Sequence, residues 1–178
     1  MVARPTRGFT LIELMIVVAI VAVLAVLATV GYAKFVRSAH MAEASDILAD
    51  IRKAEESFRA ENGAYLNVST DLDHLYPAPT PGKFATQWGG PCSGCIAGVQ
   101  WSTLNILPNA PVYFGYAVIA DPATVPTLTV NGVNVDLSAM TAPWYVAAAR
   151  ADLNGNGVFC SVYATSSSNQ LMVDREGE

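Results

Sequence analysis

The sequence predicts an α+β fold in which a long N-terminal helix packs on an antiparallel β-sheet. Three observations support this class. Residues 9–33 are almost wholly apolar, residues 34–62 continue with apolar side chains at helical spacing, and short strand-like runs separated by turn residues occupy about 112–174. We therefore expect a leader over residues 1–8, a helix over residues 9–62 and a globular head over residues 63–178.

The N-terminal part has the composition of a membrane segment behind a basic leader. Residues 1–8 contain Arg4 and Arg7 and no acidic residue. Residues 9–33 exceed the stretch of about 20 residues that a helix needs to cross a bilayer. Basic residues at the extreme N-terminus favour keeping that end in the cytoplasm. We expect a single-pass protein with its head directed outward.

A carboxylate lies at the start of this apolar segment. Glu13 is followed by residues 14–28, which include no polar side chain. An ionised group within hydrocarbon is costly and is usually retained for a function. The only plausible small-residue cleavage point, Gly8, precedes the apolar core, whereas an ordinary secretory signal is cut after it. Cleavage after Gly8 would leave the apolar segment on the mature chain, beginning at Phe9.

The run Gly8-Phe9-Thr10-Leu11-Ile12-Glu13-Leu14-Met15-Ile16-Val17-Val18-Ala19-Ile20 resembles the class III signal of type IV pilins and type II secretion pseudopilins. The resemblance covers about the first third of the chain. It implies cleavage at Gly8-Phe9 by a prepilin peptidase and N-methylation of Phe9. It also implies that Glu13 pairs with the free amine of a neighbouring subunit, which would relieve the cost of a lone carboxylate in lipid.

Two positions depart from the family pattern. The family often has Gly in the middle of the segment and Pro near its end, and here these positions hold Ala22 and Val30. Pro would break the helix locally, whereas Val would not. Gly31 still weakens the same region, by roughly 1 kcal/mol relative to Ala. Local melting of the helix in a filament is therefore left open.

The second half of the helix is predicted to be amphipathic and to be half-buried by the head. Asn62-Gly63 supplies a helix stop. The segment of about 65–111 is rich in Pro and Gly and is expected to be an irregular αβ-loop. A loop of this length inside a compact domain usually has a function. Apolar residues at helical spacing form the predicted buried stripe: Ala44, Ile47, Leu48, Ile51, Ala54 and Phe58.

Six strand-like runs follow the loop, and Asn131-Gly132 between two of them is a strong hairpin signal. An antiparallel sheet packed on the amphipathic part of the helix is the expected head. The runs are 112–120, 127–130, 133–137, 144–149, 158–164 and 170–174.

One loop resembles the opening of a calcium-binding loop. Asp152, Asn154 and Asn156 place oxygen ligands at alternating positions, Gly157 provides the turn, and Phe159 would supply a backbone carbonyl. Only Asp152 is charged and Tyr163 occupies the twelfth position, so a site would be weak unless Asp174 or Glu176 joins it. A turn rich in Asn and Gly needs no metal and is the favoured alternative. Calcium is thus the one cofactor expectation.

Three cysteines, Cys92, Cys95 and Cys160, are disulfide candidates. Cys92 and Cys95 have the spacing of a redox dithiol, but nothing around them suggests the helix N-terminus that would lower a thiol pKa. A structural disulfide in an oxidising compartment is favoured. The sequence leaves open whether Cys92 pairs with Cys95 or whether Cys160 ties either of them to the sheet.

These observations predict a structural subunit of an extracytoplasmic type IV pilus-like filament and no enzymatic activity. The alternatives are a type II secretion pseudopilin and a membrane-anchored thiol oxidoreductase. The expected partners are like subunits, a prepilin peptidase, the inner-membrane assembly platform with its ATPase, and the membrane. Acidic residues outnumber basic ones, 15 to 10, which argues against general nucleic-acid binding. We expect residence in the inner membrane before assembly and in a surface or periplasmic filament afterwards.

Overall fold

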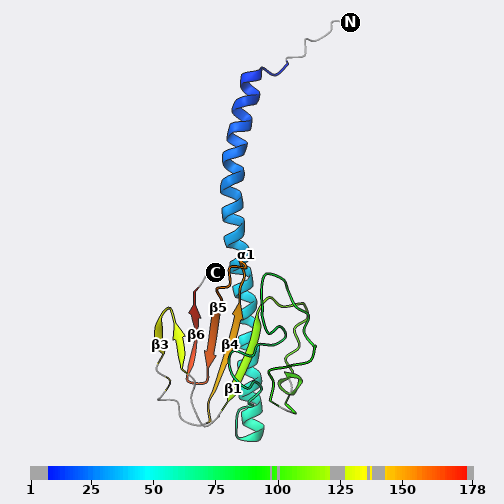
Figure 1. Ribbon diagram of the computed structural model, residues 1–178, viewed down its shortest axis with the longest axis vertical. Helices are drawn as coiled ribbons and strands as arrows, with labels where there is room; N and C mark the ends of the chain where they lie inside the picture. Colours follow the sequence, from blue (N-terminus) through cyan, green and yellow to red (C-terminus); the bar gives the residue numbers. More distant parts are fainter. Residues whose placement is uncertain are drawn as a thin grey trace. The chain divides into compact units, whose positions relative to one another are not determined.

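A computed structural model describes residues 8–96, 98–99, 101–120, 127–135, 137 and 143–175. It divides the chain into two compact units, Met1–Val36 and Arg37–Glu178. Helix α1, Leu11–Asn62, contributes residues to both units, and six strands follow it (Figure 1). A long N-terminal helix followed by an antiparallel sheet confirms the predicted α+β class. The leader and the predicted domain boundaries stay predictions.

The first unit consists of the N-terminal part of α1 and the residues that precede it. Its apolar side chains are exposed: Phe9 is 82% exposed, and the large apolar residues that follow are also mostly accessible. By length and composition this is a helix that could cross a membrane. A continuous apolar surface of this kind fits a membrane anchor, where lipid would cover it.

The second unit is built on a four-stranded antiparallel sheet of order β1-β4-β5-β6. Its strands are β1 Gly115–Ala120, β4 Tyr145–Ala151, β5 Cys160–Thr165 and β6 Ser168–Asp174. A separate hairpin pairs β2, Leu128–Val130, with β3, Val133–Val135. Asn131 and Gly132 have φ values of 51° and 76°, as the two-residue turn predicted here requires. Each of the six strand-like runs predicted from the sequence overlaps one of these strands.

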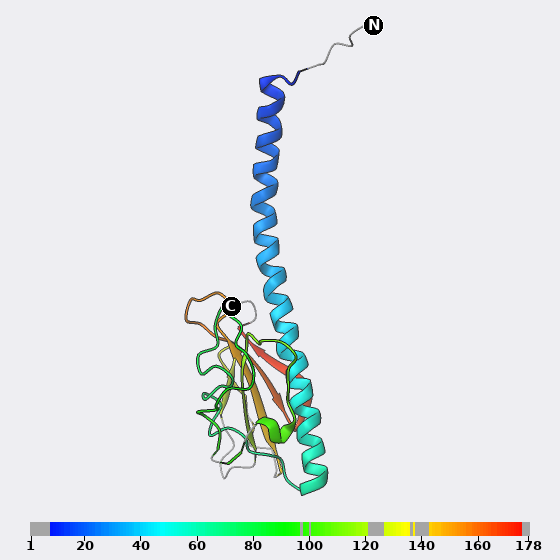
Figure 2. The same cartoon turned by 90° about the vertical axis from the view of Figure 1, so that its right-hand side faces the viewer.

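One face of the sheet packs against the C-terminal half of α1, which lies along it in Figure 2. Most of the predicted helix stripe is buried, and Leu48 and Ile51 are wholly inaccessible. Small side chains on the strands that face this core let the helix and the sheet approach closely. Alternate residues of three strands face this core: Tyr116, Val118 and Ala120 of β1, Tyr145, Ala147, Ala149 and Ala151 of β4, and Val162 and Ala164 of β5.

The opposite face of the sheet has its own core, formed with the β2–β3 hairpin and its neighbours. Ile119, Val146, Ala148 and Tyr163 point to this side and meet Leu128 from β2. Hairpin and sheet are also joined at one end, because the Asn131 N–H donates to the Asp174 carboxylate at 2.7 Å. Burial on both faces explains why every residue of β1 and β5 is buried rather than every second one.

The segment between α1 and β1 is irregular in its described part, apart from the short 3-10 helix η1, Trp101–Leu104. Isolated bridges hold it to itself and to the sheet, joining Ser69 to Cys95, Tyr76 to Tyr116 and Thr86 to Val112. An aromatic cluster fills its interior: Tyr76, Trp88 and Trp101 are in mutual ring contact. Tyr116 of β1 adds its ring to Trp88. The long loop is therefore a packed part of the head.

Candidate processing and assembly site

The junction between leader and helix is an accessible stretch of irregular backbone. Gly8, Phe9 and Thr10 precede α1, which begins at Leu11. A Cβ atom added at Gly8 would meet nothing within 4 Å, so no neighbouring side chain crowds the backbone there. An exposed, non-helical segment next to a glycine suits a peptidase that needs an extended substrate.

Glu13 and Thr10 form a reciprocal cap at the start of α1. The Glu13 Oε2 atom accepts the Thr10 backbone N–H at 2.9 Å and the Thr10 hydroxyl at 2.8 Å. In return the Glu13 N–H donates to Thr10 Oγ1 at 3.3 Å. This is a capping box, in which the residues at the N-cap and three positions later satisfy each other's backbone donors.

The capping box was not anticipated, although its signature, Thr-x-x-Glu before an apolar run, stands in the sequence as Thr10 to Glu13. The Glu13 carboxylate bonds to Thr10, the residue immediately after Phe9. Within a subunit the carboxylate thus has hydrogen-bond donors and lies close to where cleavage would create an amine. Pairing with the amine of a neighbouring subunit stays a prediction.

A comparison with protein-family models gives a match to the prokaryotic N-terminal methylation motif over residues 3–29. The chain carries a class III pilin-type signal. The matched residues include Gly8, Phe9 and Glu13 and the first part of the exposed apolar helix, and the resemblance predicted from the sequence is confirmed. The class III signal indicates a structural pilin-like protein, and it implies prepilin peptidase processing and assembly with like subunits.

The class III signal covers only the N-terminal part of the chain. Comparison with curated proteins and with solved structures gave no significant match. The signal is shared by pilins and pseudopilins, so the distinction between them depends on the head. Three features of the head bear on it: the cysteines, the Asn/Gly loop and the packed αβ-loop.

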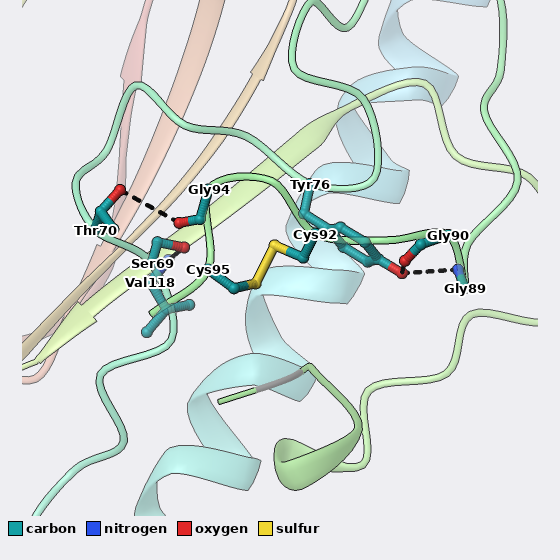
Figure 3. The surroundings of a disulfide bond; sticks show 9 residues. All are labelled: Ser69, Thr70, Tyr76, Gly89, Gly90, Cys92, Gly94, Cys95 and Val118. Atoms are coloured by element: carbon teal, nitrogen blue, oxygen red, sulfur yellow. Dashed lines mark hydrogen bonds between the residues drawn. A yellow bond between two sulfur atoms is a disulfide. The ribbon is translucent and has the colours of Figure 1, made fainter. Parts of the chain in front are cut away.

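A disulfide joins Cys92 to Cys95 and closes a small turn within the αβ-loop (Figure 3). The turn is held on one side by Gly94, whose carbonyl accepts the Thr70 N–H at 3.0 Å. Nearby, the Tyr76 hydroxyl accepts the Gly89 N–H at 2.9 Å and donates to the Gly90 carbonyl at 3.1 Å. The disulfide therefore belongs to a bonded network inside the loop.

The disulfide has the surroundings of a structural bond. Residues 91–96 form a turn and a bridge, and neither cysteine begins a helix, so the helix dipole that lowers a catalytic thiol pKa is not supplied there. Cys160 does not tie the loop to the sheet. It is buried in β5, with its Sγ atom 3.4 Å from the Met41 sulfur. This arrangement gives the thiol oxidoreductase alternative no support.

The Asp152 loop is organised by bonds to its own backbone. The Asp152 carboxylate accepts N–H groups from Gly155 at 2.7 Å, Asn156 at 3.1 Å and Gly157 at 2.8 Å. These bonds, that of Gly157 first, hold the pKa of the Asp152 carboxyl below its usual range. Asn154 Oδ1 accepts the Asn156 N–H at 2.9 Å. The loop is a network of Asx turns with the carboxylate at its centre.

The donor set fits calcium only weakly. In the described part of the chain, no three His, Cys, Asp or Glu side chains gather as a metal group would. Asp174, one of the two carboxylates that could have joined the loop, instead accepts the Asn131 N–H of the β2–β3 hairpin. The other, Glu176, lies outside the described residues. Calcium binding through Asp152, Asn154, Asn156 and the Phe159 carbonyl stays a prediction.

Proposed function

We propose that this chain is a structural subunit of an extracytoplasmic type IV pilus-like filament and that it is not itself an enzyme. The observation that carries the proposal is the class III signal, placed on an exposed apolar helix with the Glu13 carboxylate at its start. Lipid would cover this helix before assembly, and the helices of neighbouring subunits would cover it afterwards. The head would form the filament surface.

The required chemistry would come from partners. A prepilin peptidase would cut after Gly8 and methylate the Phe9 amine. An inner-membrane platform driven by a cytoplasmic ATPase would then extract the subunit. The new amine of one subunit and Glu13 of its neighbour would form an ion pair in the apolar filament core, where an unpaired carboxylate costs several kcal/mol. Extraction from lipid would thus be coupled to correct docking.

A type II secretion pseudopilin is the second candidate. Two observations favour it, the Asn/Gly loop around Asp152 and the Glu61-Asn62-Gly63 helix end. A packed αβ-loop with its own disulfide supports a pilus subunit instead, because it provides a rigid and specialised outer surface. We favour the pilus.

The test combines processing and assembly in a host that carries the assembly machinery. Intact-mass analysis of the parent should find a chain that begins with N-methylated Phe9, and Gly8→Leu should leave the precursor in the membrane. Glu13→Ala should be processed and inserted yet yield few sheared filaments. Thr10→Ser, which keeps a hydroxyl at the cap, is the matched control and should assemble.

Immunogold microscopy with antibody against the head assigns the filament. Continuous labelling of long surface fibres is expected for a major subunit, and sparse or terminal labelling indicates a minor one. Retention of the protein in the envelope with unlabelled fibres would favour the pseudopilin. Normal filaments from Glu13→Ala would refute the pairing mechanism, and mature protein from Gly8→Leu would refute the cleavage site.

A further inference from the structure

A groove of about 990 Å³ lies on the head, between the C-terminal half of α1 and the segment that follows η1. The helix forms one wall with residues between 43 and 61, and the loop forms the other with residues 103–112. Its apolar lining includes the half-buried Phe58 and the exposed Leu107, which is 67% accessible. All of these residues belong to the second unit, so the groove is a feature of the head alone.

The walls of the groove are anchored in place. Glu43 reaches from the helix to the loop, where its Oε1 atom accepts the Tyr113 N–H at 2.9 Å. Val112 pairs with Thr86 by two backbone bonds of 2.7 and 2.9 Å. A groove that exists before its ligand arrives spares the ligand the cost of ordering it.

The rim of the groove is acidic. Asp46, Asp50 and Glu61 line it and are exposed, and Lys53 is the one cation among the lining residues. Lys53 lies 3.0 Å from Asp50, in an exposed pair that offsets a single carboxylate. The groove therefore has apolar side chains within and an excess of negative charge around them, which suits an occupant with aromatic and cationic side chains.

A segment with such side chains lies at the end of the apolar helix. Tyr32 and Phe35 are 71% and 72% exposed. Lys34 and Arg37 lie beside them, and residues 14–42 include no acidic residue. On α1, Tyr32 and Phe35 are three residues apart and share one face. Lys34 lies about 100° around the helix from Phe35, near enough for its long side chain to reach a carboxylate at the edge of the groove.

We propose that the groove receives the segment 32–37 of a second copy of this chain, with Phe35 against Phe58 and Leu107 and with Lys34 against the acidic rim. This inference rests on the proposed filament function and specifies a contact between subunits. Groove and segment are different surfaces of one chain, so the contact is heterologous. Heterologous contacts that do not close into a ring propagate as helical filaments.

Cysteine cross-linking tests the contact in assembled filaments. Phe35→Cys combined with Leu107→Cys should yield a ladder of covalent multimers when sheared filaments are oxidised and run under non-reducing conditions. The matched control is Phe35→Cys with Val133→Cys. Val133 is as exposed as Leu107, at 67%, but lies on the β2–β3 hairpin and not in the groove. Filaments that form normally yet give no ladder, or the same ladder in both pairs, would overturn the proposal.

A charge swap provides a second readout that does not depend on the cysteines. Asp46→Lys with Asp50→Lys should lower the yield of sheared filaments roughly tenfold or more, because like charges would face each other across the contact. Adding Lys34→Asp should restore part of the assembly, and circular dichroism should show folded heads throughout. Loss without restoration would refute this contact and leave the filament function standing. A parent chain that forms no filaments would refute the proposed function and this contact with it.

Discussion

Glu55 is a buried carboxylate on the C-terminal half of α1. It continues the buried face of α1 and is wholly inaccessible, which is unusual for a carboxylate. Its Oε2 atom accepts the Leu66 N–H at 2.9 Å, whereas Oε1 has no hydrogen-bond partner among the described residues. Desolvation therefore dominates and raises the pKa of Glu55 from 4.5 to about 7.

The direction of the shift determines how stability depends on pH. Below pH 4.5 the Glu55 carboxyl is protonated in both the folded and the unfolded chain, so its ionisation costs nothing. Between pH 4.5 and about 7 the unfolded chain releases the proton and the folded chain retains it, and the free energy of unfolding falls. A rise of the Glu55 pKa from 4.5 to about 7 lowers the free energy of unfolding by about 3 kcal/mol by pH 8.

Glu55→Gln should remove most of this dependence, because the amide carbonyl still accepts the Leu66 N–H and no charge is buried. We expect the variant to be more stable than the parent at pH 8 and similar to it or less stable at pH 5. The assay is urea unfolding of the mature chain in detergent at pH 5, 6, 7 and 8. Tryptophan fluorescence is the readout, since Trp88, Trp101 and Trp144 all belong to the head.

Glu56→Gln is the matched control. It removes the carboxylate of the next residue, whose side chain is 51% exposed. This control should retain the parent's loss of stability between pH 5 and pH 8. Equal pH dependence in the parent and in Glu55→Gln would refute the assignment of the effect to this buried carboxyl.

Two further predictions concern the loops of the head. Gly94→Ala should lower the free energy of unfolding by about 2 kcal/mol, because the new Cβ would clash with His74 Cβ. Gly90→Ala, whose Cβ would meet no atom within 4 Å, should be close to neutral, and equal melting temperatures for the two variants would contradict the clash. Asp152→Ala should abolish any rise of the melting temperature on adding calcium and leave the response to magnesium unchanged. A calcium-induced rise of the same size in the parent and in Asp152→Ala would exclude this loop as the site.

Much of the candidate site could be predicted from local sequence. The run from Gly8 to Glu13 ahead of an apolar stretch identified the class III signal, because such a signal is defined by residues that are adjacent in the sequence. Asn131-Gly132 likewise predicted the hairpin turn, since the conformation of a two-residue turn is set by its own residues. The Thr10–Glu13 cap was equally local and was readable in the same stretch.

The predicted helix stripe did not include Glu55, because a carboxylate is expected on a solvated face. The position is nevertheless on the buried side of α1, four residues after Ile51. Only the packed structure shows that the Leu66 backbone comes close enough to donate to it.

The sequence by itself determined the apolar helix, its class III signal and the α+β class, because these follow from composition and from contacts within a few residues. Tertiary structure alone decided that Cys92 bonds to Cys95 and that Cys160 packs beside Met41. It also decided that the sheet is covered on both faces and that an acid-rimmed groove lies beside α1. Each of these depends on residues far apart in the chain, whose proximity is set by the free energy of the whole packed core.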